Sequence, residues 1–557
     1  MRTKIGLDRR QTEVAGMRER RLLAGACGVA LFALALRLGP LYWSPLPFNP
    51  DGVGYAGLAR DALTLGEFPL DGMATDQVGY SALLSVVTAL AGGQALTTAQ
   101  PTSAFVGAAI VLVGVVLAAR LAADAGVDPA RVRAAGLLAG LLVSVEGVIL
   151  YRSMPTDEQT AGLLLVPAVA LVVDRWLRTA GRRWLALAAL FLVVIPPLHN
   201  LTGLVTGVTV TVLAGVTVVR DPRRGAAVRA VGTALVTWVY VVGYHLVVAG
   251  TTGAVIVQAD RLVRVPGLFV AWVVLAVVAG AWFVTTSSRV QRGAALVVLG
   301  VPFGLIAVNA VRTVFPSTTA TPSGLLVLLL PLAIPAIAAG LAAHVPARSR
   351  TAGGVTVALV AAPVAIVCTG LTAALTFEYL SLVYRSHLFA HVPLLALAGV
   401  GAVTVFGAER ERLTAVCVVV VLVAAAVSAP VAYAGLELRT YKSITTEAEF
   451  GATAYATATV DSWATDDHLG RVAGYHGGGG ARGPVYDWLR GGGPPPNCPV
   501  LAQQSWTTTG AQFHPQRPAT ITEAAYRDWL YRNHVVYAVD ASDPLVLVVP
   551  RGNATRC

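Results

Sequence analysis

Carboxylates follow two apolar segments of this chain, in positions where they could meet. Asp51 lies in the stretch Asn-Pro-Asp-Gly-Val-Gly-Tyr after the first apolar segment, and the pair Asp157-Glu158 follows about two apolar segments later. A carboxylate can accept a proton from an attacking hydroxyl or bind a divalent cation. If both groups lie at one membrane face, the sequence predicts a site there. Other acids of the first stretch, Asp71 and Asp76 among them, are interpreted as interfacial or helix-capping charges.

Arginine, tyrosine and histidine side chains flank these acids and are candidates to bind an anionic substrate. Tyr55 follows the first acid, Arg152 precedes the acidic pair, and His199 follows a double proline. Arg385 and His387 belong to a later segment, Tyr-Arg-Ser-His. Arginine binds phosphate through charge-assisted, often bidentate hydrogen bonds. Together with the carboxylates, these residues could transfer a group from a lipid phosphate to an acceptor hydroxyl.

Each candidate also has a structural alternative. Asp51 could be a turn residue, because it follows Asn-Pro and precedes Gly. Asp157 and Glu158 could cap the helix that follows them, the arginines could be interfacial anchors, and His199 could be structural. Glu146 lies within an apparent span, where a carboxylate is costly unless it faces a polar cavity. We expect it to pair with an arginine, which the sequence does not identify.

The elements that must position these residues are membrane spans. Of the 557 residues, 55% are hydrophobic and only 13% are charged, whereas about a quarter are charged in ordinary soluble domains. The apolar residues recur in runs of roughly 18 to 25, the length that crosses a bilayer core. We therefore predict an all-α polytopic membrane protein with about 13 transmembrane helices. The predicted spans are 21–43, 102–119, 134–150, 160–173, 184–198, 201–219, 230–250, 268–285, 294–311, 324–343, 355–376, 388–406 and 413–435.

The arginines predict which ends of the spans face the cytoplasm. Basic loops recur at 120–133, 175–183, 220–229, 289–292, 348–350 and 410–412. With a cytoplasmic N-terminus all of these loops lie inside, as the positive-inside rule requires. This distribution accounts for the net charge of +11 and argues against nucleic-acid binding. This placement of every basic loop on the cytoplasmic side holds only if the apolar segment 79–91 does not cross the membrane and lies at its outer interface. The alternative is that 79–91 is an ordinary short span.

An odd number of spans places the C-terminal segment outside the cell. Its helical pattern over 522–533, followed by strand-like runs at 535–539 and 545–549, predicts a small α/β domain. Cys498 and Cys557 can form a disulfide if this domain is extracytoplasmic. The chain is thus expected in the cell (plasma) membrane. Its predicted parts are a basic cytoplasmic segment 1–20, a transmembrane domain 21–435 with outer loops 44–101 and 151–159, and an extracytoplasmic domain 436–557.

Four motifs occur in a characteristic order. Asp-Gly-Val-Gly-Tyr-Ala-Gly-Leu-Ala at 51–59 is followed by Gly-Tyr-Ser-Ala-Leu-Leu at 79–84, by Tyr-Arg through Asp-Glu at 151–158, and by Tyr-Arg-Ser-His at 384–387. Their order resembles the C-type glycosyltransferase (GT-C) superfamily, multi-span enzymes that use polyprenyl-phosphate-linked sugars. The superfamily includes protein mannosyltransferases, lipid A aminoarabinose transferases and the catalytic subunits of oligosaccharyltransferases. The resemblance runs from the first span to about residue 401.

The resemblance implies a role for each candidate residue. The first-loop acid, Asp51, would activate the acceptor as a base. Asp157 and Glu158 would assist catalysis and would bind a divalent cation, Mg²⁺ or Mn²⁺, if the enzyme uses one. Arg152 and Arg385 would hold the departing lipid phosphate. The remaining candidates would contact substrate: Tyr55, His199 and His387.

Two departures from the family pattern narrow this expectation. The first loop has Asp51-Gly52 in place of an adjacent acidic pair, so the base is assigned to Asp51 alone. The C-terminal segment has Tyr-Asp-Trp at 486–488 and lacks the Trp-Trp-Asp signature of oligosaccharyltransferases, which favours transfer of a single sugar to a lipid, glycan or protein acceptor. The alternatives are a secondary transporter or lipid flippase, and a non-catalytic component of polysaccharide assembly or export.

Overall fold

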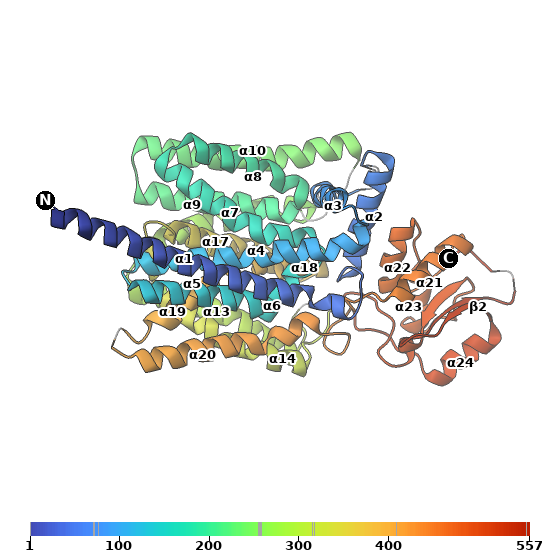
Figure 1. The fold of residues 1–557 in the computed structure, drawn as a ribbon. Helices are drawn as coiled ribbons and strands as arrows, with labels where there is room; N and C mark the ends of the chain where they lie inside the picture. The colour runs from blue at the N-terminus through green and yellow to red at the C-terminus, as the bar shows by residue number, and fades with distance from the viewer. Residues whose placement is uncertain are drawn as a thin grey trace.

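The computed structural model is an α-helical bundle with a smaller domain at one end (Figure 1). Asp71 and Asp76 lie outside the residues that it describes. The described residues are 2–557 apart from 69, 71, 72, 76, 254–258, 315, 317, 408 and 553, with backbone alone for 2–19, 259 and 260.

The long helices confirm an all-α polytopic fold. Within the described chain, 11 helices are long and apolar enough to cross a membrane, or 12 if the bent pair α5–α6 is one span. The prediction of about 13 also counted α8, whose 17 residues are at the lower limit for a bilayer core of about 30 Å. The bundle comprises α1 (Arg2–Leu38), α4 (Ala95–Asp124), α5 (Pro129–Val145), α6 (Gly147–Ser153), α7 (Glu158–Thr179), α8 (Arg182–Leu198), α9 (Asn200–Arg220), α10 (Arg224–Thr252), α12 (Pro266–Thr285), α13 (Ser288–Val311), α14 (Ser323–Leu329), α15 (Ala333–Ala342), α16 (Val345–Arg348), α17 (Gly353–Ala373), α18 (Phe377–Ser386), α19 (His391–Thr404) and α20 (Glu411–Val427).

Burial separates inner from outer helices. The central segments of α7, α9, α17 and the α18–α19 pair bury two thirds or more of their residues, whereas those of α10, α12 and α13 bury less than a quarter. The buried core consists mainly of Ala, Val and Leu. Lipid chains are as apolar as these side chains, so the outer helices need no protein partner on their outward faces.

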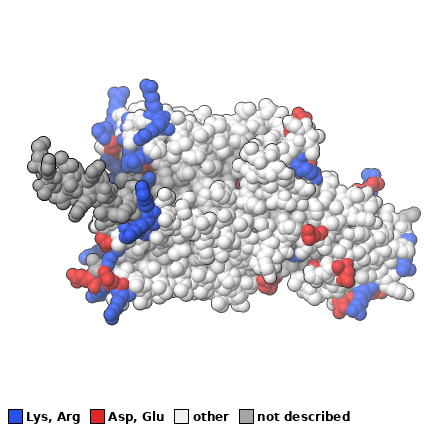
Figure 2. All heavy atoms as spheres, viewed as in Figure 1, with Lys and Arg blue, Asp and Glu red and all other residues white. Residues whose placement is uncertain are grey.

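The arginine-rich loops gather at the end of the bundle that holds the N-terminus. Lys and Arg are concentrated there, and the middle of the visible face carries almost no charge (Figure 2). Contacts join loops that are distant in sequence: Ser349 Oγ donates to Asp124 Oδ2 (2.5 Å), and Arg131 Nη2 donates to the carbonyl of Gly407 (2.8 Å). The basic loops therefore share one side of the bundle, as the sequence predicts. We call this the basic end, and the opposite end the domain end.

Two shorter helices lie at the domain end, α2 (Pro50–Leu65) and α3 (Val78–Ala91). With 14 residues, α3 is too short to cross a bilayer core, and Figure 1 shows it nearly end-on, across the direction of the long helices. A Cβ at Gly79 would lie 2.9 Å from Cα of Leu198, so only glycine lets α3 approach the end of α8. The expected non-crossing helix is present, and its place at a membrane interface remains a prediction.

A bend of 67° separates α5 from α6 and explains the buried acid Glu146. Its side chain is 1% exposed, and its oxygens accept the backbone N–H groups of Val148 (3.1 Å) and Ile149 (2.8 Å) in the first turn of α6. Its side-chain partner is His391, whose Nδ1 lies 3.1 Å away, so the expectation of an arginine was wrong. The bend turns a helix N-terminus toward the carboxylate, which therefore needs no arginine.

The C-terminal domain is a small α/β unit, as predicted. Its three strands form one antiparallel sheet in the order β1-β3-β2, packed around a core that includes Trp506, Tyr526 and Trp529. A disulfide joins Cys498 to Cys557, the pairing that the sequence allows. The elements are α21 (Glu447–Thr459), α22 (Asp467–Ala473), α23 (Gly483–Leu489), β1 (Val500–Gln503), α24 (Glu523–Arg532), β2 (His534–Val539) and β3 (Leu545–Val549).

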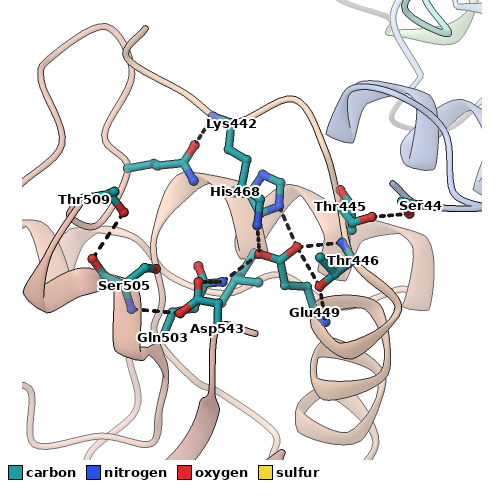
Figure 3. Close-up of polar contacts among 12 residues, drawn as sticks. Ser44, Lys442, Thr445, Thr446, Glu449, His468, Gln503, Ser505, Thr509 and Asp543 are labelled. Atoms are coloured by element: carbon teal, nitrogen blue, oxygen red, sulfur yellow. Dashed lines mark hydrogen bonds and ion pairs between the residues drawn. The ribbon is translucent and has the colours of Figure 1, made fainter. Parts of the chain in front are cut away.

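A buried carboxylate ties this domain to residues 434–446, which we call the linker. Glu449, 1% exposed, accepts hydrogen bonds from Lys442 Nζ (2.8 Å), Gln503 Nε2 (2.7 Å) and the N–H of Thr446 (2.7 Å) (Figure 3). Burial alone would raise the pKa of Glu449, but the charges of His468 and Lys442 outweigh it and hold that pKa below its usual range. Because the carboxylate stays ionised, it holds the linker against the domain.

Candidate active site

The first candidate acid stands at the start of α2. Asn49 caps this helix by accepting the N–H of Asp51 (3.3 Å), and Pro50 occupies the first turn, where its missing N–H is tolerated. Gly52 faces the second outer loop, because a Cβ there would lie 2.7 Å from Cβ of Thr156. This close approach places Asp51 beside the loop that carries the second acidic pair.

Asp51 is held by an arginine of the C-terminal domain. Its Oδ1 lies 2.8 Å from Nη1 of Arg471 on α22, and the two side chains are 39% and 49% exposed. The other oxygen, Oδ2, lies 3.4 Å from Nδ2 of Asn49. The carboxylate is therefore oriented by the protein and still accessible to a substrate from outside.

Candidate residues from three segments of the chain meet around Glu158. The hydroxyl of Tyr55 donates to Glu158 Oε2, and Oε1 lies 3.7 Å from Nε2 of His199. The imidazole of His199 is 1% exposed, and its Nδ1 contacts Thr202 Oγ1 at 2.8 Å. The buried histidine thus orients Glu158, and its role as a substrate contact remains a prediction.

Asp157 occupies the N-cap of α7. Its Oδ1 accepts the N–H of Gln159 (2.8 Å), so the helix-capping alternative describes a contact that is present. The side chain of Gln159 donates to the carbonyl of Arg385 (3.0 Å), and Asp157 lies within the electrostatic field of that arginine. The second acidic pair therefore adjoins the Tyr-Arg-Ser-His motif at 384–387 as well.

The two candidate phosphate ligands have no carboxylate partner among the described residues. The guanidinium of Arg152 lies 5.0 Å from the ring centroid of Tyr151 and 5.1 Å from that of Tyr384, and its buried Nε has no hydrogen-bond partner there. The half-buried side chain of Arg385 likewise forms no ion pair within the described chain. Their role as phosphate ligands remains a prediction.

His387 lies between Tyr384 and His391. Its Nδ1 is 3.3 Å from the carbonyl of Val383, and its ring packs between those of Tyr384 (5.6 Å) and His391 (5.4 Å). The ring connects the arginine region with the pair formed by His391 and Glu146. Contact of His387 with substrate remains a prediction.

The described residues contain no group of three His, Cys, Asp or Glu side chains arranged to hold a metal ion. Glu158 already contacts Tyr55 and His199, and Asp157 caps a helix. The two acids by themselves do not make a complete set of ligands for Mg²⁺, which prefers octahedral oxygen coordination. We therefore derive no step through a metal.

The C-terminal half supplies site residues that the sequence analysis missed. Arg471 pairs with the candidate base, the hydroxyl of Tyr441 contacts that of Tyr151 across 290 positions of sequence, and Arg439 stacks on the same Tyr151 ring at 3.6 Å. No local motif marks these residues, because their partners come from distant elements.

His514 lies where the positive charges of several arginines act together. Its Nδ1 contacts Thr440 Oγ1 at 2.9 Å. Burial first, and then the positive charges of Arg471, Arg152 and Arg385, lower the pKa of His514 to about 4. The arginines of the bundle and of the domain therefore act on one place, between the two parts of the molecule.

Comparisons with known proteins give only structural matches. The sequence matches no family model and no curated protein. One similar structure is the archaeal oligosaccharyltransferase AglB from Archaeoglobus fulgidus in complex with an inhibitory peptide and a dolichol-phosphate, with 12% identity and a TM-score of 0.47. The oligosaccharyltransferase of the same organism also matches in its apo form (12%, 0.47) and in complex with Zn and sulfate (13%, 0.47).

These matches cover much of this chain but little more than half of the others. The alignments include 79%, 79% and 78% of this chain, and 58%, 58% and 55% of the archaeal chains. The enzyme class named is one of those in the GT-C superfamily. At this identity and TM-score the likeness does not identify an activity, and the function is argued from the chain's own residues.

Proposed function

We propose that the chain is an integral-membrane glycosyltransferase that moves a single sugar from a polyprenyl-phosphate donor to an acceptor hydroxyl. The observation that carries this proposal is the meeting, at the domain end, of an oriented carboxylate with arginines that lack carboxylate partners among the described residues. The GT-C resemblance of the sequence motifs supports the same reaction. The acceptor is a lipid, glycan or protein at the outer membrane face.

Asp51 is the base in this reaction. The acceptor oxygen attacks the anomeric carbon of the donor sugar, and its proton passes to Asp51 Oδ2, the oxygen that does not face Arg471. The bond between the anomeric carbon and the phosphate oxygen breaks, and its electron pair leaves with the lipid phosphate. Arg471 keeps the carboxylate oriented throughout the transfer.

Arg152 and Arg385 bind the leaving phosphate. Negative charge develops on the phosphate oxygen as the glycosidic bond breaks, and preorganised positive groups stabilise it most in a site that excludes water. Glu158 and Asp157 fix the surrounding loop through Tyr55, His199 and Gln159. If a divalent cation takes part, Asp157 and Glu158 are the residues proposed to bind it.

The test compares sugar transfer by the native chain and by Asp51→Asn. Membranes containing each protein receive labelled polyprenyl-phosphate sugar, and labelled acceptor is quantified at equal protein levels. Loss of a general base is expected to lower transfer by about 10²- to 10⁴-fold. The matched control is Asp128→Asn at the basic end, where Asn preserves the cap of α5. Equal transfer by the native chain and Asp51→Asn would refute the role of Asp51.

A further inference from the structure

The linker carries an arginine that the proposed mechanism does not use. The guanidinium of Arg439 lies 3.6 Å from the ring centroid of Tyr151 on α6. Its terminal nitrogens, Nη1 and Nη2, are both buried and have no hydrogen-bond partner among the described residues. Buried N–H donors that have no acceptor lower the stability of the folded protein.

A second arginine approaches the same ring. Arg152 lies 5.0 Å from the centroid of Tyr151, and its own buried Nε has no partner in the described chain. Two like charges beside one aromatic ring repel each other, and the ring's quadrupole offsets only part of that cost. An anion between them would satisfy the open donors and cancel the repulsion.

Contacts on both sides hold the linker in place. Thr440 Oγ1 contacts Nδ1 of His514 (2.9 Å), and the N–H of Lys442 donates to Gln512 Oε1 (2.7 Å). On the bundle side, the N–H of Asn49 donates to the carbonyl of Ser443 (2.7 Å). Arg439 is therefore presented by a segment fixed between the first outer loop and the C-terminal domain.

We propose that Arg439 binds, together with Arg152, the phosphate of the lipid-linked donor. The planar guanidinium matches two phosphate oxygens at once, which a lysine ammonium does not. The hydroxyls of Tyr151 and Tyr441, which contact each other, lie beside the arginine pair. The linker, and through it the C-terminal domain, thus forms one wall of the donor site. This inference rests on the proposed function and adds a residue to it.

Binding of polyprenyl phosphate to the full chain in lipid nanodiscs tests the inference. We expect Arg439→Gln to weaken binding by about 10- to 100-fold, the value of one charge-assisted contact, and Arg439→Lys to weaken it less. The control is Arg532→Gln, on the surface of the C-terminal domain, where Arg532 pairs with Asp528 and is 74% exposed. It should bind as the native chain does.

Two further probes identify what is recognised. Polyprenol without phosphate should not compete, whereas inorganic phosphate should compete only at much higher concentration than the lipid. If inorganic phosphate competes as well as the lipid, the site takes free phosphate. A purely structural Arg439 would lower the melting temperature of the ligand-free variants and leave the affinity unchanged.

The outcomes separate the two proposals. Native affinity in both Arg439→Gln and Arg439→Lys would overturn the role of Arg439, even if sugar transfer is observed. If Arg439→Gln does not fold, native affinity in Arg439→Lys alone would overturn it. Absence of both transfer and polyprenyl-phosphate binding in the native chain would instead reject the proposed function.

Discussion

Two arginines of the basic end and two of the domain end differ in their partners. At the basic end, Arg178 Nε lies 2.8 Å from Asp174, and Arg223 Nη2 lies 2.6 Å from Asp221. At the domain end, Arg152 and Arg439 stack on a tyrosine and have no carboxylate partner in the part of the chain that is described. The first group is paired with acids of the protein, whereas the second has buried donors without a partner among the described residues.

The difference distinguishes arginines that orient the chain in the membrane from arginines of the candidate site. Positive loops set the orientation of a membrane protein wherever they lie along the chain, and they lose nothing by pairing with nearby acids. A buried arginine without a counter-charge lowers stability, and proteins retain such groups mainly where function requires them. The two ends should therefore respond in opposite ways to loss of charge.

The largest expected effect is on activity at the domain end. Arg152→Gln should lower kcat/KM for sugar transfer by about 10²- to 10³-fold, the cost of removing one preorganised donor from a developing negative charge. Arg223→Gln at the basic end, where the side chain is 84% exposed, should change it less than about twofold. Similar losses in both variants, measured at equal protein levels, would abolish the distinction between the ends.

A smaller effect, of opposite sense, is expected on stability. Arg178→Gln leaves Asp174, whose side chain is 10% exposed, without its partner, and should lower the free energy of unfolding by about 1–3 kcal/mol. Arg152→Gln should leave it unchanged or raise it, because the partly buried Arg152 forms no ion pair among the described residues. Thermal unfolding in detergent measures both, and a lower melting temperature for Arg152→Gln would contradict the comparison.

The sequence predicts the fold of the bundle well because its signals are local. Apolar runs and arginine-rich loops can be read within a window of about 20 residues, and the C-terminal helix and hairpin follow equally local patterns: α24, β2 and β3. The count of spans is less certain, because α8 has a marginal length and α5–α6 is broken at Glu146.

The site is only half predictable for the opposite reason. Its acids and the bundle arginines stand near helix ends, where turn and cap residues mark them, and the structure brings four predicted segments together. The partner of Asp51 lies 420 positions away, on α22. Such a contact depends on how the C-terminal domain docks on the bundle, and no periodicity in the sequence encodes that docking.

The smallest expected effect concerns pH and the field of the unpaired arginines. Burial, with Arg471 and the bundle arginines, lowers the pKa of His514 from 6.5 to about 4. Between these values the unfolded chain binds a proton that the folded chain does not, so stability is full above pH 6.5 and falls as the pH drops toward 4. The free energy of unfolding should therefore fall by about 1–2 kcal/mol less in His514→Gln than in the native chain between pH 7 and 5.

Melting temperatures across this range check the sign, with His534→Gln on β2 as the control, since that histidine is exposed. Polyprenyl phosphate sharpens the test. An anion bound between the arginines would cancel the positive field at His514, raise its pKa and reduce the acid loss of stability in the native chain. In His514→Gln the lipid should change the pH dependence less than in the native chain, because only the phosphate itself, with a second pKa of about 6, then titrates in this range. A lipid effect of equal size in both proteins would mean that the anion binds away from this histidine, and the arginines of the bundle and domain would then not form one site.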